Sequence, residues 1–196
     1  MTVRLPLPDL AARVCAGEAR LGRTRLVCID GPAGSGKTTL AARLATALGP
    51  GATVVHMDDL YEGWTMTGAV DRLQAGVLEP LAEARPGAYR RYDWDAGRFS
   101  PDLVPVPVPD VLIVEGCGSS PRQFDPWVTL RIWVEAPREL RMTRGIERDG
   151  AALRNRWLEW QDLEAAVFAA EGTRAGADLR VDGAIACPDD SVALLG

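Results

Sequence analysis

The stretch GPAGSGKT, Gly31 to Thr38, matches the pattern G-x-x-x-x-G-K-[ST] at every fixed position. An apolar run rich in branched residues, 24–30, precedes it, and an uninterrupted helical stretch, 38–49, follows it. A buried strand, a glycine-rich turn and a helix form the context that this pattern needs in order to bind phosphate. The alternative is a glycine-rich turn with an accidental lysine, and the flanking elements disfavour it.

Each residue type in this loop has a chemical task. Glycines let the backbone curl, so that several N–H groups face phosphate at the positive end of the following helix. Lys37 reaches the terminal phosphates, and the Thr38 hydroxyl ligates Mg²⁺. The predicted nucleotide-binding residues are Gly31, Ala33, Gly34, Ser35, Gly36, Lys37, Thr38 and Thr39. The loop predicts nucleotide binding, but it does not indicate where the phosphate goes.

Composition limits the class of protein. The chain has 196 residues, of which 47% are hydrophobic, enough for one domain (1–196) with a real core. Its net charge of −5 argues against a general nucleic-acid surface. Four cysteines without a CxxC pair fit neither a zinc site nor a disulfide scaffold, which favours a cytoplasmic protein with reduced thiols. No signal peptide or membrane span is expected.

Buried strands alternate with helices along the chain, which predicts an α/β fold. We expect a doubly wound parallel sheet of about five strands with helices on both faces, the P-loop NTPase fold. Strands are expected at 24–30, 52–58, 110–116, 128–136 and 177–183. Helices are expected at 8–21, 38–49, 67–84 with a break near Pro80, 137–148 and 155–172.

Two segments stand outside this core. Residues 60–108 are expected to form a substrate cap with a small hairpin that turns at Asp95-Ala96-Gly97. The alternating prolines of LVPVPVPD suit an extended connector and forbid a central strand. Residues 141–156 are expected to form a lid.

Acidic residues end three of the expected strands, where open parallel sheets bind ligands. Asp58 is placed to take a proton from a hydroxyl acceptor and to hold Mg²⁺. Glu115 could hold Mg²⁺ through water, pair with Lys37, or cap the turn that follows it. Asp30 precedes the phosphate loop and is expected to belong to its scaffold, and Asp59 is expected to be solvated or structural.

These elements together resemble the uridine kinase and phosphoribulokinase-like group of P-loop kinases. That group combines the phosphate loop with a D-x-[FL]-Y element, a Y-D-[FW] element in a cap hairpin, and E-G after the third strand. Here these are DDLY at 58–61, YDW at 92–94 and EG at 115–116, and the resemblance covers roughly 25–182. It implies a kinase that uses ATP and Mg²⁺, with Asp58 as the general base.

The same resemblance implies that Tyr61, Asp71 and Tyr92 line the acceptor pocket. The alternatives are cap packing for both tyrosines and a solvated helix face for Asp71. For Trp64 and Trp94, packing is the expected role.

Arg141, Arg144 and Arg148 share one helical face by their spacing. Such a row resembles the lid of small kinases, where arginines neutralise charge in the transition state. We assign Arg141 and Arg144 to catalysis and Arg148 to substrate binding, and the alternative is a solvated face.

Later residues give weaker signals. The resemblance suggests Gln161 for the acceptor site and Arg174 beside adenine, whereas Trp157 and Trp160 are expected to pack in the core. Uridine kinases carry a histidine shortly after Y-D-F, but the matching stretch here is DAGRF. The only histidine of the chain, His56, is expected to be a core residue. Uridine itself is therefore in doubt, although phosphoryl transfer is not.

We expect a kinase that acts on a small, nucleoside-like hydroxyl compound. The alternatives are a kinase for a vitamin precursor, an antibiotic or a nucleoside monophosphate, and the last stays open because the cap contains arginines, namely Arg90, Arg91 and Arg98. A nucleotide-binding regulatory switch is the alternative of another class. It should carry a motif such as N-K-x-D, which the sequence lacks.

Overall fold

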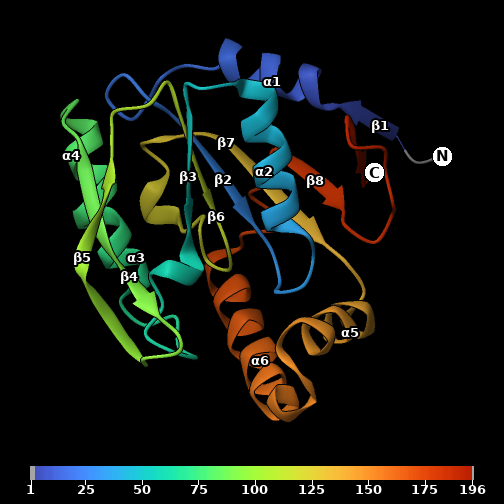
Figure 1. Ribbon diagram of the computed structural model, residues 1–196. Coiled ribbons are helices and arrows are strands. Elements are labelled where there is room, and N and C mark those ends of the chain that lie inside the picture. The colour runs from blue at the N-terminus through green and yellow to red at the C-terminus, as the bar shows by residue number, and fades with distance from the viewer. Residues whose placement is uncertain (1–2, 196) are drawn as a thin grey trace.

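A seven-stranded sheet forms the centre of the molecule (Figure 1). The structure is a computed structural model that describes residues 3–195. Five strands run parallel, in the spatial order β8-β7-β2-β6-β3, and β9 and β1 add an antiparallel edge next to β8. The strands are β1 (Val3–Pro6), β2 (Arg25–Asp30), β3 (Ala52–His56), β6 (Val111–Glu115), β7 (Val128–Glu135), β8 (Leu179–Asp182) and β9 (Ser191–Leu194).

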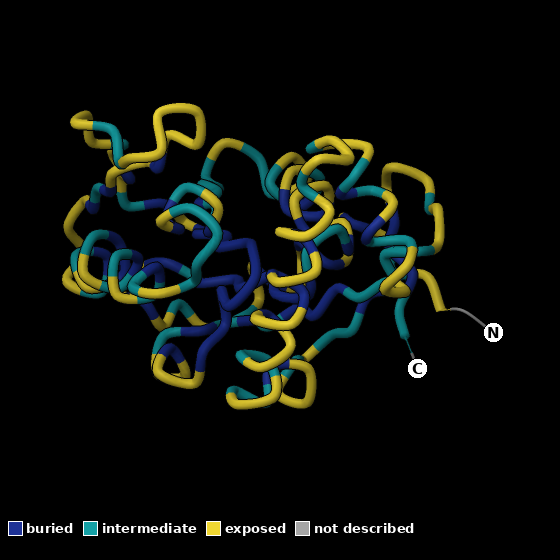
Figure 2. The backbone as a smooth tube through the Cα atoms, turned by 90° about the horizontal axis from the view of Figure 1, so that it is seen from below, coloured by how far each residue is buried: buried dark blue, intermediate teal, exposed yellow. Residues whose placement is uncertain are grey.

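Two separate hydrophobic cores cover the two faces of this sheet. On one face, α1 (Leu7–Ala16) and α2 (Lys37–Leu48) pack on alternate residues of the central strands, such as Val27 and Ile29. On the other face, residues such as Leu26 and Cys28 meet the cap and α6 (Arg154–Glu171). Figure 2 shows the buried positions concentrated in this central layer. The expected doubly wound α/β arrangement is confirmed.

The cap lies beside β3 and consists of a hairpin and a helical segment (Figure 1). The hairpin pairs β4 (Gly87–Asp93) with β5 (Arg98–Val106), and its turn includes the predicted residues 95–97. The prolines of β5 lie in a two-stranded sheet, where an unpaired edge tolerates them. The helical segment comprises α3 (Ala69–Leu73), a π-helical turn η2 (Gln74–Leu78) and α4 (Glu79–Ala82). The π turn ends at Leu78, two residues before Pro80, which lies in the first turn of α4 and has no backbone N–H to donate.

Several sequence-based expectations were wrong in detail. The sheet has seven strands rather than about five, because β1 and β9 have only four residues each, which is too short for a residue pattern to predict a strand. The first helix ends at Ala16 and not near 21, since Gly17 takes an extended conformation. Strand β3 ends at His56, and a single 3₁₀ turn, η1 (Met57–Asp59), carries Asp58.

The segment after β7 contains α5 (Arg138–Asp149), which begins after Pro137 and ends before Gly150, and the short turn η4 (Ala151–Leu153). Helix α6 ends at Gly172, whose φ of 65° lies in the left-handed region. Between these helices and the cap lie the carboxyl ends of the parallel strands (Figure 1). None of the helices within residues 3–195 is both long and apolar enough to span a membrane.

Candidate active site

A cavity of about 1250 Å³ opens at the carboxyl ends of the parallel strands. The phosphate loop forms its floor, η1 and the cap form one wall, and α5 and α6 form another. The segment that follows β8 forms the remaining side. Among the predicted site residues, the cavity lining contains Ala33, Gly34, Ser35, Gly36, Lys37, Thr38, Thr39, Asp58, Tyr61, Glu115, Arg144 and Arg148.

The phosphate loop adopts the curled backbone that the motif requires. Gly31, Gly34 and Gly36 all have positive φ, at 137°, 78° and 102°. At Gly31 and Gly34 a Cβ atom would also collide with neighbouring backbone, so that only glycine fits there. Helix α2 begins directly after Gly36, which directs its N-terminal N–H groups toward the loop.

Asp30 holds this loop in place from below. Its carboxylate is buried and accepts hydrogen bonds from the backbone N–H groups of Gly31, Gly118 and Ser120 at 2.7, 2.9 and 3.0 Å. Burial raises the pKa of Asp30 to about 6, although these three donors oppose the shift. Its place beneath the loop agrees with the scaffold role predicted from the sequence.

Thr38 and Glu115 provide oxygen ligands beside the loop. The Thr38 hydroxyl donates to Glu115 Oε1 at 3.1 Å, and His56 Nδ1 lies 2.6 Å from the same oxygen. Within residues 3–195 no three His, Cys, Asp or Glu side chains form a complete metal centre. The two side-chain oxygens of Thr38 and Glu115 suit Mg²⁺, which proteins bind through one or two side chains together with phosphates and water. The residues present therefore fit Mg²⁺ delivered with a nucleotide.

The expectation for His56 was wrong. Its side chain is 39% exposed and contacts Glu115, whose hydrogen bond is the main cause of the raised pKa of His56. His56 belongs to the site because β3 and β6 pair in register there, His56 opposite Glu115.

Asp58 reaches the cavity from η1, opposite the phosphate loop. The residue is exposed to the cavity, yet surrounding protein raises its pKa by desolvation, and the charge of Glu115 raises it further. Its neighbour Asp59 points elsewhere: it accepts a hydrogen bond from the Tyr89 hydroxyl at 2.9 Å and pairs with Arg91 at 3.1 Å. Asp59 thus has the structural role, fixing η1 to the cap hairpin.

Lys37 is buried and points into the loop. Its Nζ donates to the Pro32 carbonyl at 3.0 Å and lies 3.6 Å from Cys117 Sγ. Burial raises the pKa of Cys117 well above its usual value, so its thiol stays protonated. This agrees with the sequence-based view that Cys117 is not a nucleophile.

The three lid arginines have different partners. Arg144 lines the cavity and donates to the carbonyls of Gly34 and Gly183 at 3.1 and 3.0 Å. Arg148 lines it too, paired with Asp149 at 2.7 Å. Arg141 does not line the cavity, because it forms a buried ion pair of 2.9 Å with Glu164 on α6. The structure therefore places Arg141 in the scaffold of the loop, against its predicted catalytic role.

Gly31, at the start of the phosphate loop, lies outside the cavity lining, and so do four further predicted residues. Asp71 is exposed on α3, and Tyr92 is buried against Trp94 and Phe99 in the cap. Gln161 is buried, and its Oε1 accepts from Arg138 at 2.7 Å. Arg174 is paired with Glu135 at 2.6 Å on the surface. Tyr92, Gln161 and Arg174 are held away from the cavity by partners on other elements. Asp71 lies on the exposed side of its helix.

Tyr61 does line the cavity, but its hydroxyl donates to the Cys117 carbonyl at 2.7 Å and its ring is buried. It offers a ring surface rather than a free hydroxyl. Tyr61 therefore packs in the core with most of its ring and also forms part of the cavity wall.

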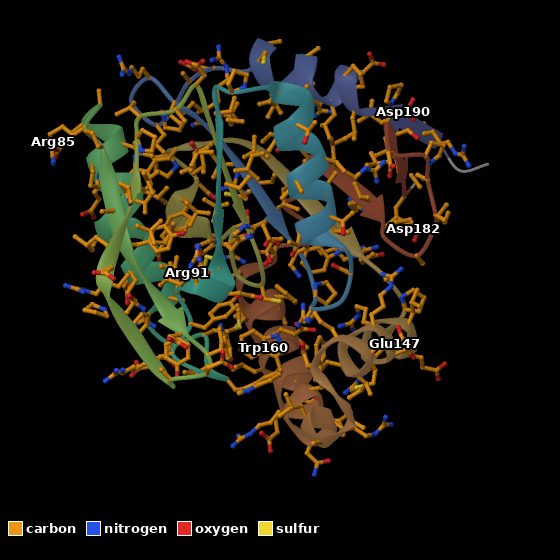
Figure 3. The ribbon with its side chains drawn as sticks, in the orientation of Figure 1. Arg85, Arg91, Glu147, Trp160, Asp182 and Asp190 are labelled. Atoms are coloured by element: carbon orange, nitrogen blue, oxygen red, sulfur yellow. The ribbon has the colours of Figure 1, made fainter. Side chains whose placement is uncertain are left out.

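Sequence reasoning missed an aromatic wall. Trp64, Trp94, Trp157 and Trp160 all line the cavity. Figure 3 shows Trp160 on α6, between the cap hairpin and α5. The D-x-[FL]-Y and Y-D-[FW] elements were the available signals, since Trp64 and Trp94 lie within or just after them.

No protein-family model matches the chain. A curated uridine kinase of Halobacterium salinarum is 29% identical over 136 residues, which are 62% of this chain and 60% of that protein. The match thus spans less than two thirds of that relative's length.

Two solved structures share the fold. One, described as a possible uridine kinase from Bacillus stearothermophilus, has a TM-score of 0.65 and 21% identity, covering 89% of this chain and 96% of its own. The other, provisionally assigned as a fructose transport system kinase of Silicibacter sp. TM1040, has a TM-score of 0.63 and 25% identity, covering 90% and 98%.

Proposed function

Because the chain resembles the uridine kinase and phosphoribulokinase-like group of P-loop kinases in both sequence and fold, we propose that it is an ATP-dependent, Mg²⁺-dependent kinase of a small hydroxyl compound. The observation that carries the proposal is the presence of Asp58 in the same cavity as the phosphate loop and Lys37. The named relative favours a nucleoside-like acceptor.

The phosphate loop binds and orients the nucleotide. Its backbone N–H groups and Lys37 hold the phosphates, and the fixed positions of these donors lower the reorganisation needed as charge develops. Bound Mg²⁺ would be held by Thr38 and Glu115, with Asp58 nearby, and it would supply neutralisation of phosphate charge.

Asp58 acts on the acceptor. Its carboxylate accepts the proton of the attacking hydroxyl as the oxygen bonds to the γ phosphorus, while the bond to the leaving ADP oxygen breaks. A raised pKa makes Asp58 a better proton acceptor than an ordinary aspartate, provided that it is ionised at the working pH. Arg144 and Arg148 line the same cavity. Their positive charges stabilise the negative charge that develops on the phosphoryl group in the transition state.

The arginines of the cap argue against a nucleoside monophosphate as acceptor. None of Arg90, Arg91 and Arg98 lines the cavity. Arg91 pairs with Asp59, and Arg90 donates to the carbonyls of Ser100 and Pro101. A monophosphate would need free cations at this wall.

The direct test measures ADP formation from Mg²⁺–ATP with single acceptors, against a blank without acceptor. Nucleosides, nucleoside monophosphates and sugars should be compared in the wild type and in Lys37→Ala. We expect a large rise over the blank with at least one alcohol, abolished by Lys37→Ala. ADP formation that no acceptor increases would favour the regulatory ATPase instead.

A further inference from the structure

Glu164 is a buried carboxylate on α6 that contacts the phosphate loop from outside the cavity. The residue is 1% exposed and does not line the cavity. Its Oε2 accepts a hydrogen bond from the backbone N–H of Ala33 at 2.8 Å, and its Oε1 accepts one from Arg141 on α5 at 2.9 Å. A buried carboxylate is costly unless it is paired and hydrogen-bonded, and the phosphoryl transfer proposed above does not use this one.

The charge of Glu164 does not explain its place beside an anion-binding loop. Arg141 pairs with one of its oxygens, and Cys117 Sγ donates to the other at 3.3 Å. A carboxylate near bound phosphate still repels it, because like charges repel. The contact that joins Glu164 to the loop is therefore the hydrogen bond from Ala33, rather than an attraction to the ligand.

One peptide plane connects Glu164 to Lys37. In a trans peptide the N–H and C=O groups lie in one plane and point in opposite directions. The N–H of the peptide between Pro32 and Ala33 donates to Glu164, and its carbonyl, that of Pro32, accepts from Lys37 Nζ at 3.0 Å. A rotation that moved this N–H away from Glu164 would also move the carbonyl away from Lys37. Glu164 thus fixes the backbone acceptor that holds the Lys37 ammonium group.

Ala33 is held at both of its backbone polar groups, directly before the donors of the loop. Arg141 donates to the Ala33 carbonyl at 3.4 Å, while Glu164 accepts from the Ala33 N–H. Within residues 3–195, the N–H groups of Gly34 and Gly36 form no hydrogen bond, which leaves them free for phosphate. The fixed peptide and the free donors are therefore adjacent along the loop.

We propose that Glu164 is a positioning residue for phosphate binding, which orients Lys37 and the free N–H groups of the loop through the peptide between Pro32 and Ala33. The inference rests on the proposed function, since it concerns the binding of the nucleotide phosphates. Glu164 itself touches no substrate. Loss of its hydrogen bond should weaken the binding of a polyphosphate by about tenfold, the usual effect of removing one hydrogen bond to a charged group.

The test measures the Kd of tripolyphosphate and of ADP by calorimetry, together with the thermal stability of each variant. Glu164→Ala should bind tripolyphosphate about tenfold more weakly than the wild type. Glu164→Gln keeps an oxygen that can accept from the Ala33 N–H, so it should restore most of the affinity. Glu159→Gln is the matched control, because Glu159 lies exposed on the same helix and pairs only with Arg156 at the surface. It should bind both ligands as the wild type does.

A double variant separates positioning from a purely structural role. Arg141→Met combined with Glu164→Met replaces the buried ion pair by apolar side chains, which should restore much of the stability lost in Glu164→Ala. The affinity for tripolyphosphate should stay low, because the Ala33 N–H still lacks its acceptor. Affinity that recovers together with stability, or wild-type affinity in Glu164→Ala, would overturn the inference and leave the proposed function intact. A wild type that binds neither tripolyphosphate nor ADP would refute the proposed function, and this inference with it.

Discussion

Gly183, which directly follows β8, lies against the phosphate loop so closely that no other residue fits. A Cβ atom at this position would lie 1.8 Å from the Ser35 carbonyl oxygen and 3.2 Å from a methyl group of Val134. The backbone of Gly183 is also fixed on both sides, since its N–H donates to the Glu135 carbonyl at 2.8 Å and its carbonyl accepts from Arg144 at 3.0 Å. Gly183→Ala should therefore displace the loop rather than the segment that follows β8.

The size of the effect follows from this distance. A carbon and a carbonyl oxygen need about 3.3 Å, so the two backbones must separate by about 1.5 Å. Ser35 is fully buried, and overpacking of this kind costs about 1–3 kcal/mol of folding free energy. A shift of about 1 Å in groups that position a substrate can cost about 10²-fold in rate. We expect kcat/KM for ATP to fall by about that factor.

The assay is steady-state kinetics with ATP as the varied substrate, together with thermal unfolding of both proteins. Gly176→Ala is the matched control, because its Cβ atom would meet only the carbonyl oxygens of Gly172 and Thr173 at 3.7 and 3.9 Å. That variant should behave as the wild type. If Gly183→Ala kept the wild-type kcat/KM for ATP, the reasoning that this segment fixes the phosphate loop would be refuted.

Three further predictions concern single side chains. The pKa of Asp30 is raised to about 6 in the folded protein. Protonation of Asp30 therefore stabilises the fold fully below the pKa of an ordinary aspartate, and this stabilisation is lost as the pH rises through 6. Denaturation from pH 4 to 7 should show Asp30→Asn gaining about 3 kcal/mol relative to the wild type, and a constant difference would contradict this. Arg141→Ala leaves Glu164 without its ion-pair partner and should lower the free energy of unfolding by about 3 kcal/mol. Arg144→Ala should instead mainly raise the KM for ATP. Equal losses of stability in the two variants would contradict the structural role of Arg141 and the binding role of Arg144. His56→Asn removes the hydrogen bond that orients the glutamate at the end of β6, and should raise the Mg²⁺ needed for half-maximal activity by about tenfold. An unchanged Mg²⁺ requirement would show that His56 has no such role.

The floor of the site could be predicted from the sequence because it depends on local patterns. The phosphate loop is a contiguous motif, Glu115 is the last residue of β6, and Asp58 follows the end of β3 by two residues. Parallel strands bring their carboxyl ends to one edge of the sheet, so these residues meet in one cavity whatever the loops do.

The walls of the site could not be predicted in the same way. Helical spacing groups Arg141 with Arg144 on α5. Of these two only Arg144 lines the cavity, because Arg141 forms a buried ion pair with Glu164 on another helix. Likewise, nothing local indicates that Trp64 and Trp160, almost a hundred residues apart, share one wall. Such contacts depend on how the cap and α6 pack together, which the residue pattern of each alone does not specify.

The central claim is that Asp58 takes the acceptor proton in a kinase reaction. The most direct measurement is the single-turnover formation of phosphorylated acceptor by the wild type and by Asp58→Asn, with ATP affinity measured in parallel. We predict that the variant binds ATP but forms product at least about 10²-fold more slowly. Product formation near the wild-type rate in Asp58→Asn, or ADP released by the wild type with no phosphorylated acceptor, would contradict the account.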